Sequence, residues 1–446
     1  MTKVITYGTY DLLHKGHIRL LERAKQLGDF LIVGVTADCF DRSRGKINVQ
    51  QSLMERIEAI RATGLADQII VEEYEGQKID DIKKYDVDIF TVGSDWVGKF
   101  DYLNEFCKVV YLDRTQGISS SDIRSEFRNI RIGVIGESPI INKFIKECGY
   151  VNGVSIAGIC SEDTSKLDLN ALPLPLITNR IDKLLPCSDA IYVISRPEKH
   201  FGIIKEAFDF GKHVLCESPV TLKISDYYTL KAIADEKGLV LMDGVKTAYS
   251  TAFERLVLLV KGGIIGDVIS IDSTCTSMEK FALYGEQEFK YLWNSITEWG
   301  PTALLPVFDI LGTNYTDCHI ITKLLAPSSD FDLFTKILLI YPHAVASVKI
   351  GQGVKSEGDL IISGTNGYVY VPAPWWKTDY FEVRYENSTQ NRRFFYQLDG
   401  EGIRYEILSF VEQIESKIKN ARISNNISSQ TIKLIEDFYS KKFIEI

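Results

Sequence analysis

The sequence predicts an α/β protein in which two parallel β-sheets follow one another along the chain and a third region contains further half-buried strands. Short apolar segments alternate with amphipathic segments twice, over residues 1–128 and again over residues 130–245. Such alternation with short connections is typical of parallel strands that are covered by helices. Later, the apolar–polar alternation of Val345–Ile350 and Gly367–Val371 predicts half-buried strands. We therefore expect three domains, of which the last covers residues 246–446.

The composition is that of an ordinary globular protein. The 446 residues are 45% hydrophobic and 25% charged, and the formal net charge is −9. An acidic balance argues against a dedicated nucleic-acid-binding protein, although a few local cations suffice to bind anionic metabolites.

The cysteines and the apolar segments indicate where the protein resides. The eight cysteines include no Cys-x-x-Cys pair, so we expect buried thiols in a reducing compartment. No segment reaches the roughly 18 apolar residues that a membrane span requires, and the first apolar run is too short for a signal peptide. We expect a cytoplasmic protein with no membrane partner.

The first region is expected to hold five strands and four helices. The expected strands are 3–7, 30–36, 68–72, 87–93 and 108–112. The expected helices are 17–27, 51–63, 76–84 and 119–128. Ligands of parallel sheets bind beyond the carboxyl ends of the strands, at the point where the strand order switches. Three polar segments follow strands of this region and should converge on that edge, namely 8–17, 93–96 and 114–124.

The segment Gly8–His17 joins the first strand to the first helix. Its two histidines, His14 and His17, are three residues apart at the start of that helix. Free N–H groups and the helix dipole favour an anion at such a position, so both imidazoles can point at a bound phosphate. The alternative interpretation is a turn with two surface histidines.

The segment Arg114–Arg124 supplies a second phosphate-binding pattern. Gly117 permits a tight turn, and three serines from Ser119 onward begin a helix. The serines can cap that helix, and the same hydroxyl and N–H groups can hold a triphosphate with Arg114 as a cationic fork. Both interpretations remain open on spacing alone.

Two further cationic features lie between these segments. The stretch Asp41–Lys46 is either a solvated loop or a lid that brings Lys46 onto a nucleotide phosphate. Arg56, on the following helix, either holds a second anion or faces solvent.

These motifs resemble those of the glycerol-3-phosphate cytidylyltransferases, a family of the nucleotidyltransferase superfamily that carries a His-x-Gly-His motif. The resemblance covers essentially all of residues 1–128 and is carried by Gly8–His17, Leu20–Lys25, Gly98–Asp101 and Arg114–Ser121. It implies a Rossmann-like nucleotidyltransferase domain that transfers CMP from CTP to glycerol 3-phosphate or a related polyol phosphate. Such a reaction requires two anions to be aligned and the developing charge to be neutralised.

The resemblance also implies residue roles. The implied catalytic residues are His14, His17, Lys46 and Arg114. The implied nucleotide-binding residues are Gly8, Thr9, Tyr10, Asp11, Gly16, Asp95, Trp96, Arg114, Thr115, Gly117, Ile118, Ser119 and Ser120. Arg56 would bind the acceptor, and Asp11 would help to hold Mg²⁺.

The second region is again expected to alternate, and it resembles a Rossmann dinucleotide-binding domain. The expected strands are 131–136, 154–160, 189–194, 213–216 and 239–242, and the expected helices are 139–148, 200–210 and 225–237. Of the Gly-x-Gly-x-x-Gly fingerprint only Gly136 is kept, because Ser138 and Ile141 replace the other two glycines. Ser161, with Glu162 beside it, stands where an acid for the ribose hydroxyls is common, which leaves NADH and NADPH both open.

Residues 130–446 resemble the glucose–fructose oxidoreductase and inositol dehydrogenase family through Ser195–His200, Gly211–Pro219 and Leu241–Tyr249. The resemblance implies NAD(P)H as a cofactor and a last domain with an open antiparallel sheet and returning C-terminal helices. Such sheets form a subunit interface or face the substrate, and both halves resemble families that often form homodimers. The residues implied for the cofactor are Gly136, Ser138, Ser161, Glu217 and Lys246.

The chain departs from that family at the positions that move protons. Glu217-Ser218-Pro219 lacks the lysine of the family's Glu-Lys-Pro motif, and Thr302 stands where the usual proton donor would be. Threonine is a poor acid at neutral pH. Lys246 either substitutes for the missing lysine or is structural, and we interpret His200 as a capping or packing residue.

Three functional hypotheses follow. In the first, a reductase-like half reduces a keto or aldehyde phosphate to a polyol phosphate, which the transferase activates with CTP for cell-surface polymer synthesis. In the second, the C-terminal half is an inactive binding or dimerising module. In the third, the transferase uses another nucleotide or another phosphorylated acceptor.

Overall fold

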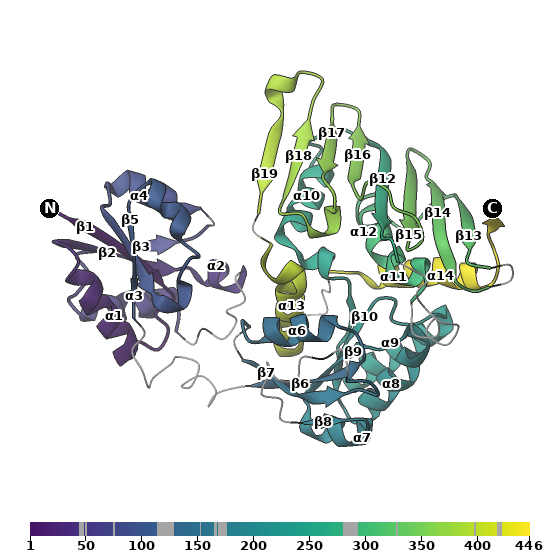
Figure 1. The fold of residues 1–446 in the computed structure, drawn as a ribbon, viewed down its shortest axis with the longest axis horizontal. Coiled ribbons are helices and arrows are strands. Elements are labelled where there is room, and N and C mark those ends of the chain that lie inside the picture. The colour runs from purple at the N-terminus through teal and green to yellow at the C-terminus, as the bar shows by residue number, and fades with distance from the viewer. Residues whose placement is uncertain are drawn as a thin grey trace. The chain divides into compact units, whose positions relative to one another are not determined.

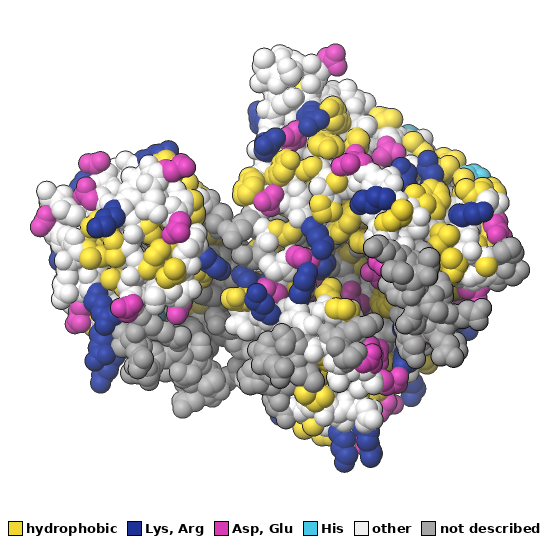
Figure 2. Space-filling model, viewed as in Figure 1, with side chains coloured by type: hydrophobic (Ala, Val, Ile, Leu, Met, Phe, Trp, Pro, Cys, Tyr) yellow, Lys and Arg dark blue, Asp and Glu magenta, His cyan; other side chains and the backbone are white. Residues whose placement is uncertain are grey.

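The chain forms two compact units (Figure 1). The computed structural model describes residues 1–43, 49, 51–74, 76–113, 129–151, 153–164, 167, 176–279, 293–326, 329–396, 398–416 and 422–446. The first unit comprises residues 1–129 and 149–154, and the second comprises residues 130–148 and 155–446. In the view of Figure 2, Lys and Arg side chains are interspersed with Asp and Glu over the described surface.

The first unit is built on a parallel sheet with the strand order β3-β2-β1-β4-β5. Its strands are β1 (Lys3–Gly8), β2 (Phe30–Thr36), β3 (Gln68–Glu72), β4 (Ile89–Gly93) and β5 (Lys108–Leu112). Its helices are α1 (Lys15–Lys25), α2 (Asp38–Ser43), α3 (Leu53–Ala62), α4 (Gln77–Tyr85), η1 (Ser94–Trp96) and η2 (Asp101–Glu105). All five expected strands are present, and the order switches between β1 and β4.

Both faces of this sheet are buried, which explains why the strands are continuous apolar runs in the sequence. Successive residues of β1 enter different cores: Val4 packs in one cluster with Leu21 of α1, and Ile5 packs in the other with Ile82 of α4. Short helix α2 was not expected, and its second half, from Asp41 to Ser43, belongs to the stretch interpreted as a loop or lid. The expected helix 119–128 and Lys46 lie outside the described residues.

The second unit begins with a parallel sheet of order β11-β10-β9-β6-β7-β8. Its strands are β6 (Ile130–Gly136), β7 (Val154–Cys160), β8 (Ile177–Thr178), β9 (Ala190–Ile194), β10 (His213–Glu217) and β11 (Leu241–Gly244). Its helices are α6 (Ile140–Cys148), α7 (Ile181–Leu184), η3 (Leu185–Cys187), α8 (Pro197–Asp209) and α9 (Ile224–Lys237). Every expected element is present, whereas β8, α7 and η3 are too short to show in the pattern. The order switches between β6 and β9.

A nine-stranded sheet completes this unit, in the order β19-β18-β17-β16-β12-β15-β14-β13-β20. Its strands are β12 (Val268–Thr276), β13 (Asp317–Leu324), β14 (Asp332–Ile340), β15 (Val345–Gly351), β16 (Leu360–Gly364), β17 (Tyr368–Val371), β18 (Tyr380–Arg384), β19 (Arg392–Phe395) and β20 (Ile444–Glu445). Most neighbours are antiparallel, as expected, but β12–β15 and β13–β20 are parallel, so the sheet is mixed. Alternation along a strand shows which face is buried and not in which direction a distant neighbour runs.

Helices join the two sheets of the second unit. The remaining elements are η4 (Lys246–Tyr249), α10 (Thr251–Lys261), α11 (Ser295–Glu298), α12 (Gly300–Leu311), η7 (Trp375–Lys377), η8 (Ser388–Gln390), η9 (Asp399–Gly402), α13 (Ile403–Ser416) and α14 (Asn425–Tyr439). Helix α12 packs against β12 and β15, whereas α13 packs against α6 and η4, and α14 packs against α9 and α12 (Figure 1). The C-terminal helices thus return to the parallel sheet.

Candidate functional site

His14 caps the first helix of the first unit. It precedes α1 with extended backbone angles (φ −123°, ψ 172°), and its Nδ1 accepts a hydrogen bond from the backbone N–H of Gly16 at 3.1 Å. Because Nδ1 accepts, the proton of the neutral ring lies on Nε2. The capping bond therefore fixes both the orientation and the tautomer of His14.

The two histidine rings lie together at this helix N-terminus. The His14 and His17 rings are stacked, with centroids 3.9 Å apart and planes 20° apart, and the first turn of α1 contains no acidic residue. The Tyr10 ring meets His17 edge-on at 5.6 Å. Two imidazoles and the positive end of a helix dipole therefore face one position, which suits a phosphate.

Gly8 and Tyr10 support this arrangement through packing. The Tyr10 side chain is buried in the core beside Leu21, and burial raises the pKa of its hydroxyl. A Cβ atom at Gly8 would lie 2.9 Å from Cζ of Tyr10, so the glycine makes room for that ring. This placement leaves only the backbone of Tyr10 for the nucleotide contact that the sequence predicts.

Arg56 requires a correction, because its guanidinium is buried and bonded to protein oxygens. Its side chain is 0% exposed and donates to the backbone oxygens of Thr9 (2.7 Å), Thr36 (2.8 Å) and Gln51 (3.1 Å). It also pairs with Asp38, and with Asp41 at 3.6 Å. With its donors used in this way, Arg56 ties the ends of β1 and β2 to α3. The Arg56 side chain therefore neither faces solvent nor is placed to bind the phosphorylated acceptor substrate.

Asp11 is buried at the same edge. Its Oδ1 accepts from the backbone N–H of Gln51 at 3.0 Å, and the Gln51 side chain accepts from the backbone N–H of Leu12 at 2.8 Å. Among the described residues, no group of three or more His, Cys, Asp or Glu side chains could by itself hold a metal ion. A single carboxylate is nevertheless compatible with Mg²⁺, which commonly takes its other ligands from substrate phosphates and water.

The end of β4 brings the other described candidates to this edge. Asp95 is exposed in η1, and Trp96 lies against Phe100 at 5.9 Å with the Lys99 ammonium 5.1 Å above its ring. Since β4 is the neighbour of β1, these residues share the switch point with the histidines. The predicted residues Arg114, Thr115, Gly117, Ile118, Ser119 and Ser120 lie outside the described residues.

Sequence reasoning missed a buried ion pair at the end of β3. Lys78 pairs with Glu72, and its ammonium lies 4.8 Å from the centre of the Tyr7 ring. Glu72 also accepts from the Thr36 hydroxyl at 2.9 Å. The charges at a strand end and a helix start were the available signal, but each resembled an ordinary surface residue.

Comparison with known proteins agrees with this geometry. Residues 5–126 match the family model described as Cytidylyltransferase-like. The glycerol-3-phosphate cytidylyltransferase of Bacillus spizizenii is 48% identical over 130 residues, which cover 29% of this chain and 100% of that protein. The enzyme of the same name from Staphylococcus aureus is also 48% identical over 130 residues, covering 28% of this chain and 95% of the relative. The chain belongs to the glycerol-3-phosphate cytidylyltransferase family.

What distinguishes this cytidylyltransferase-family chain is its second unit, where β6 ends at Gly136. That residue has φ +149°, and a Cβ atom there would lie 2.3 Å from the carbonyl oxygen of Ile194, so β6 and β9 can approach only with glycine. The Ser138 hydroxyl accepts from the N–H of Ile140 at 3.4 Å at the start of α6, which has no acid in its first turn. This loop at a switch point fits the pyrophosphate of a dinucleotide.

Ser161 and Glu162 follow β7. The buried Ser161 hydroxyl donates to the carbonyl oxygen of Asp163 at 2.8 Å, and Glu162 pairs with Lys199 of α8 at 3.2 Å. The hydroxyl of Ser161 is therefore used inside its own loop, and Glu162 is the better candidate for a ribose contact. The spacing of residues in the sequence reveals neither the hydrogen bond within this loop nor the pair between Glu162 and Lys199.

His200 is a packing residue, as interpreted from the sequence. It is fully buried, and its Nδ1 and Nε2 lie 3.0 Å and 2.7 Å from the carbonyl oxygens of Pro219 and Ser195. Burial lowers its pKa.

Glu217 and Lys246 lie at the carboxyl edge of this sheet within electrostatic reach of each other. The Tyr192 hydroxyl donates to Glu217. Burial raises the pKa of Glu217, whereas that hydrogen bond and the charge of Lys246 oppose the rise. The pKa of Glu298 is raised to about 7, mainly by loss of hydration and to a smaller extent by the charge of Glu217. Glu298 nevertheless keeps an exposed surface. Thr302 lies in α12 without a titratable group of its own.

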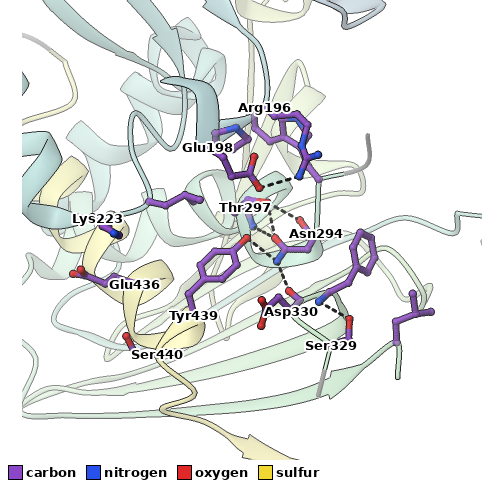
Figure 3. Close-up of a pocket in the computed structure, with 15 residues that line it drawn as sticks. Arg196, Glu198, Lys223, Asn294, Thr297, Ser329, Asp330, Glu436, Tyr439 and Ser440 are labelled. Carbon is purple, nitrogen blue, oxygen red and sulfur yellow. Dashed lines mark hydrogen bonds and ion pairs between the residues drawn. The ribbon is translucent and has the colours of Figure 1, made fainter. Parts of the chain in front are cut away.

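A cavity of about 720 Å³ lies elsewhere in this unit (Figure 3). Helices α8 and α9 begin at it with Arg196 and Lys223 as N-cap residues, and neither cap makes a side-chain hydrogen bond. Arg196 pairs with Glu198 at 3.0 Å, and the Asn294 amide donates to the hydroxyl of Tyr439 at 3.1 Å. Acidic side chains balance the cations here. None of its described lining residues is one that the sequence assigns to a ligand.

The comparisons place the second unit among oxidoreductase folds. Residues 130–245 match the family model described as Oxidoreductase family, NAD-binding Rossmann fold. A 3-ketoreductase from Actinomadura kijaniata, in complex with NADP and TDP-benzene, has a TM-score of 0.63 at 17% identity and covers 72% of this chain and 99% of that chain. UDP-N-acetylglucosamine 3-dehydrogenase from Acidithiobacillus ferrooxidans has a TM-score of 0.55 at 17% identity, covering 70% and 96%. These likenesses show the fold.

Within the described part of the chain, no helix combines the length and the hydropathy that a membrane-spanning segment requires.

Proposed function

We propose that the first unit transfers CMP from CTP to glycerol 3-phosphate or a related short polyol phosphate, and that pyrophosphate leaves. The observation that carries the proposal is the stacked pair His14–His17 at the start of α1, in a unit that matches its relatives over their full length. A phosphate oxygen of the acceptor attacks the α-phosphorus of CTP, a new P–O bond forms, and the bond to pyrophosphate breaks.

In this proposal the histidines stabilise charge that develops on the transferred phosphorus and on the leaving group. The Nε2–H of His14 is oriented by the Gly16 bond, so it can donate to a phosphate oxygen without reorganisation. Lys46 and Arg114 would neutralise the triphosphate, and the segment from Thr115 to Ser120 would hold it. Asp11 would help to hold a Mg²⁺ ion, which would neutralise charge on the phosphates.

The acceptor and nucleotide can be tested by measuring pyrophosphate release with each of four nucleoside triphosphates and several phosphorylated acceptors. We expect turnover with CTP and a short polyol phosphate. Turnover with ATP but not with CTP would contradict the proposal.

We propose that the second unit binds NAD(P)H and acts as a reductase that supplies the polyol phosphate. Gly136, Ser138 and the first turn of α6 would hold the pyrophosphate, and Glu162 would contact the ribose. When bound, the cofactor would supply a hydride. The alternative, favoured by the loss of two fingerprint glycines and by Ser218, is a binding module that supports a homodimer.

Quenching of tryptophan fluorescence on titration with NADH and NADPH distinguishes these two possibilities. We expect saturable quenching by at least one dinucleotide. An unchanged signal at millimolar concentrations of both would exclude the reductase proposal and leave the binding module. A mass measurement by light scattering tests the homodimer.

A further inference from the structure

Three lysines of the second unit converge on one carboxylate. Nζ of Lys143 lies 2.7 Å from Oε1 of Glu401, and Nζ atoms of Lys377 and Lys246 lie 3.0 Å and 3.4 Å from Oε2. The lysines come from α6, η7 and η4, which are distant in the sequence. We name these four residues the Glu401 cluster.

The cluster carries more positive charge than its own carboxylate can balance. Three ammonium groups and one carboxylate leave a formal excess of two positive charges within one cluster. Partial burial opposes ionisation of Glu401, but hydrogen bonds from Lys143 and Lys377 and the charge of Lys246 lower its pKa to about 2. The position of the Glu401 carboxylate is thus one where this protein strongly stabilises an anion.

The backbone that presents Glu401 is held in an unfavourable conformation. Glu401 has φ +54°, and the preceding Gly400 has φ +57°. A residue with a side chain in the left-handed region costs free energy and persists only when its surroundings fix it, which is common at ligand sites. Here η4 and α13 pack against η9, the segment that contains Gly400 and Glu401.

A buried carboxyl, that of Glu406, lies within electrostatic reach of Lys246, the least exposed lysine of the cluster. Glu406 of α13 is 1% exposed, and neither of its carboxylate oxygens has a hydrogen-bond partner among the described residues. Helix α13 packs against η4, and Glu406 is within electrostatic reach of Lys246 and Glu217. A buried carboxyl without a partner is costly, so a ligand that offers it hydroxyl donors gains affinity.

The exposed fraction of the side chains decreases from the three lysines of the cluster to the carboxyl of Glu406. The side chains of Lys143, Lys377 and Lys246 are 53%, 39% and 20% exposed, respectively. Glu217 is half-buried, so solvent reaches the inner end as well. Cations therefore lie outside and hydrogen-bond acceptors lie inside.

We propose that the Glu401 cluster, with Glu217 and Glu406, is a binding site for a short phosphorylated polyol or for the keto or aldehyde phosphate related to it. The outer ammonium groups bind the phosphate, and the two inner carboxyls accept hydrogen bonds from its hydroxyls. This inference rests on the proposed reductase function and names its substrate class. The shared chemistry, a phosphate group, also belongs to a dinucleotide, so the test has to separate the two.

Labelling with pyridoxal 5′-phosphate, an aldehyde that carries a phosphate, tests the site without an activity assay. Its aldehyde condenses with a lysine amine with loss of water, borohydride reduces the imine to a secondary amine, and peptide mass spectrometry locates the label. We expect Lys246 to be labelled about tenfold faster by pyridoxal 5′-phosphate than by pyridoxal, because charge-assisted hydrogen bonds hold the phosphate.

Variants and competitors identify what is bound. Lys143→Gln and Lys377→Gln should each lower labelling of Lys246 about threefold, the scale of one exposed ion pair, whereas Glu401→Gln should raise the ratio of pyridoxal 5′-phosphate to pyridoxal labelling. Lys231→Gln is the matched control, because Lys231 is 22% exposed and paired with Asp235 on α9. Glycerol 3-phosphate should protect Lys246, and glycerol should not.

Two labelling results would contradict a phosphate-binding site at the Glu401 cluster. Equal labelling of Lys246 by both aldehydes, or protection by NADP but not by glycerol 3-phosphate, would overturn the inference. Thermal unfolding of each variant is measured alongside; a variant that does not fold leaves the two-aldehyde comparison on the unaltered chain to decide. Pyrophosphate release by the unaltered chain tests the transferase independently, and dinucleotide quenching tests the reductase proposal.

Discussion

Replacing His14 by alanine and by serine separates its two roles. His14 caps α1 by accepting from Gly16, and its ring is stacked on His17 where a phosphate would bind. Alanine removes both functions, and serine keeps an acceptor suited to an N-cap but is too short to replace the imidazole. Loss of an N-cap costs about 1 kcal/mol, whereas loss of one preorganised donor to a transition state costs about 3 kcal/mol, or at least a hundredfold in rate.

The two variants should therefore diverge in stability and agree in activity. We expect pyrophosphate release from CTP to fall about a hundredfold or more in both, and urea unfolding to show a loss of about 1 kcal/mol only in His14→Ala. His17→Ala, which leaves the cap in place, should match the activity loss of His14→Ser. If His14→Ser kept the unaltered rate, capping would be the whole role of His14, and the phosphate assignment would be refuted.

Three further expectations concern the folded state. Arg56→Met should lower the free energy of unfolding by about 3–5 kcal/mol, because the buried Asp41 would lose its ion pair with Arg56 and three backbone oxygens would lose their donor; a loss in denaturant titration below 1 kcal/mol would show that Arg56 is not structural. Gly136→Ala should destabilise the second unit by at least about 1 kcal/mol, since the new Cβ would meet the Ile194 carbonyl, and unchanged thermal unfolding of that unit would contradict the packing argument. The pKa of Glu298 is raised to about 7, so the folded state holds its proton more tightly than the unfolded state, and stability from this group should fall as pH rises between about 4.5 and 7. Glu298→Gln should flatten that dependence, and an unchanged pH profile would refute it.

The sequence predicts most of this fold because both parallel sheets are covered on two faces. Val4 and Ile5 are adjacent and enter different cores, which is why β1 is a continuous apolar run. The direction of β12 beside β15 is not predictable in this way, because the chain passes through two helices and a hairpin between them.

The candidate sites likewise differ in how far the sequence predicts them, because residues close together in the sequence are predictable and distant ones are not. The spacing of His14 and His17 within one turn specifies their proximity, since residues three apart share a helix face. The sequence could not show whether Arg56 is buried, because a cation on an amphipathic helix gives the same pattern whether it is exposed or pairs with Asp41. The Glu401 cluster is invisible to sequence reasoning, because Lys143 and Glu401 are 258 residues apart.

That separation has a consequence for synthesis on the ribosome. Helix α6 buries Phe144 on one side and takes its other partner, α13, from a segment made some 258 residues later. At ordinary elongation rates α6 waits roughly 10–50 s for it. The strands of the first unit are complete by Leu112, so it can fold early, whereas the second unit stays incomplete and exposes apolar surface until translation is nearly finished. Chaperone dependence should therefore reside mainly in the second unit.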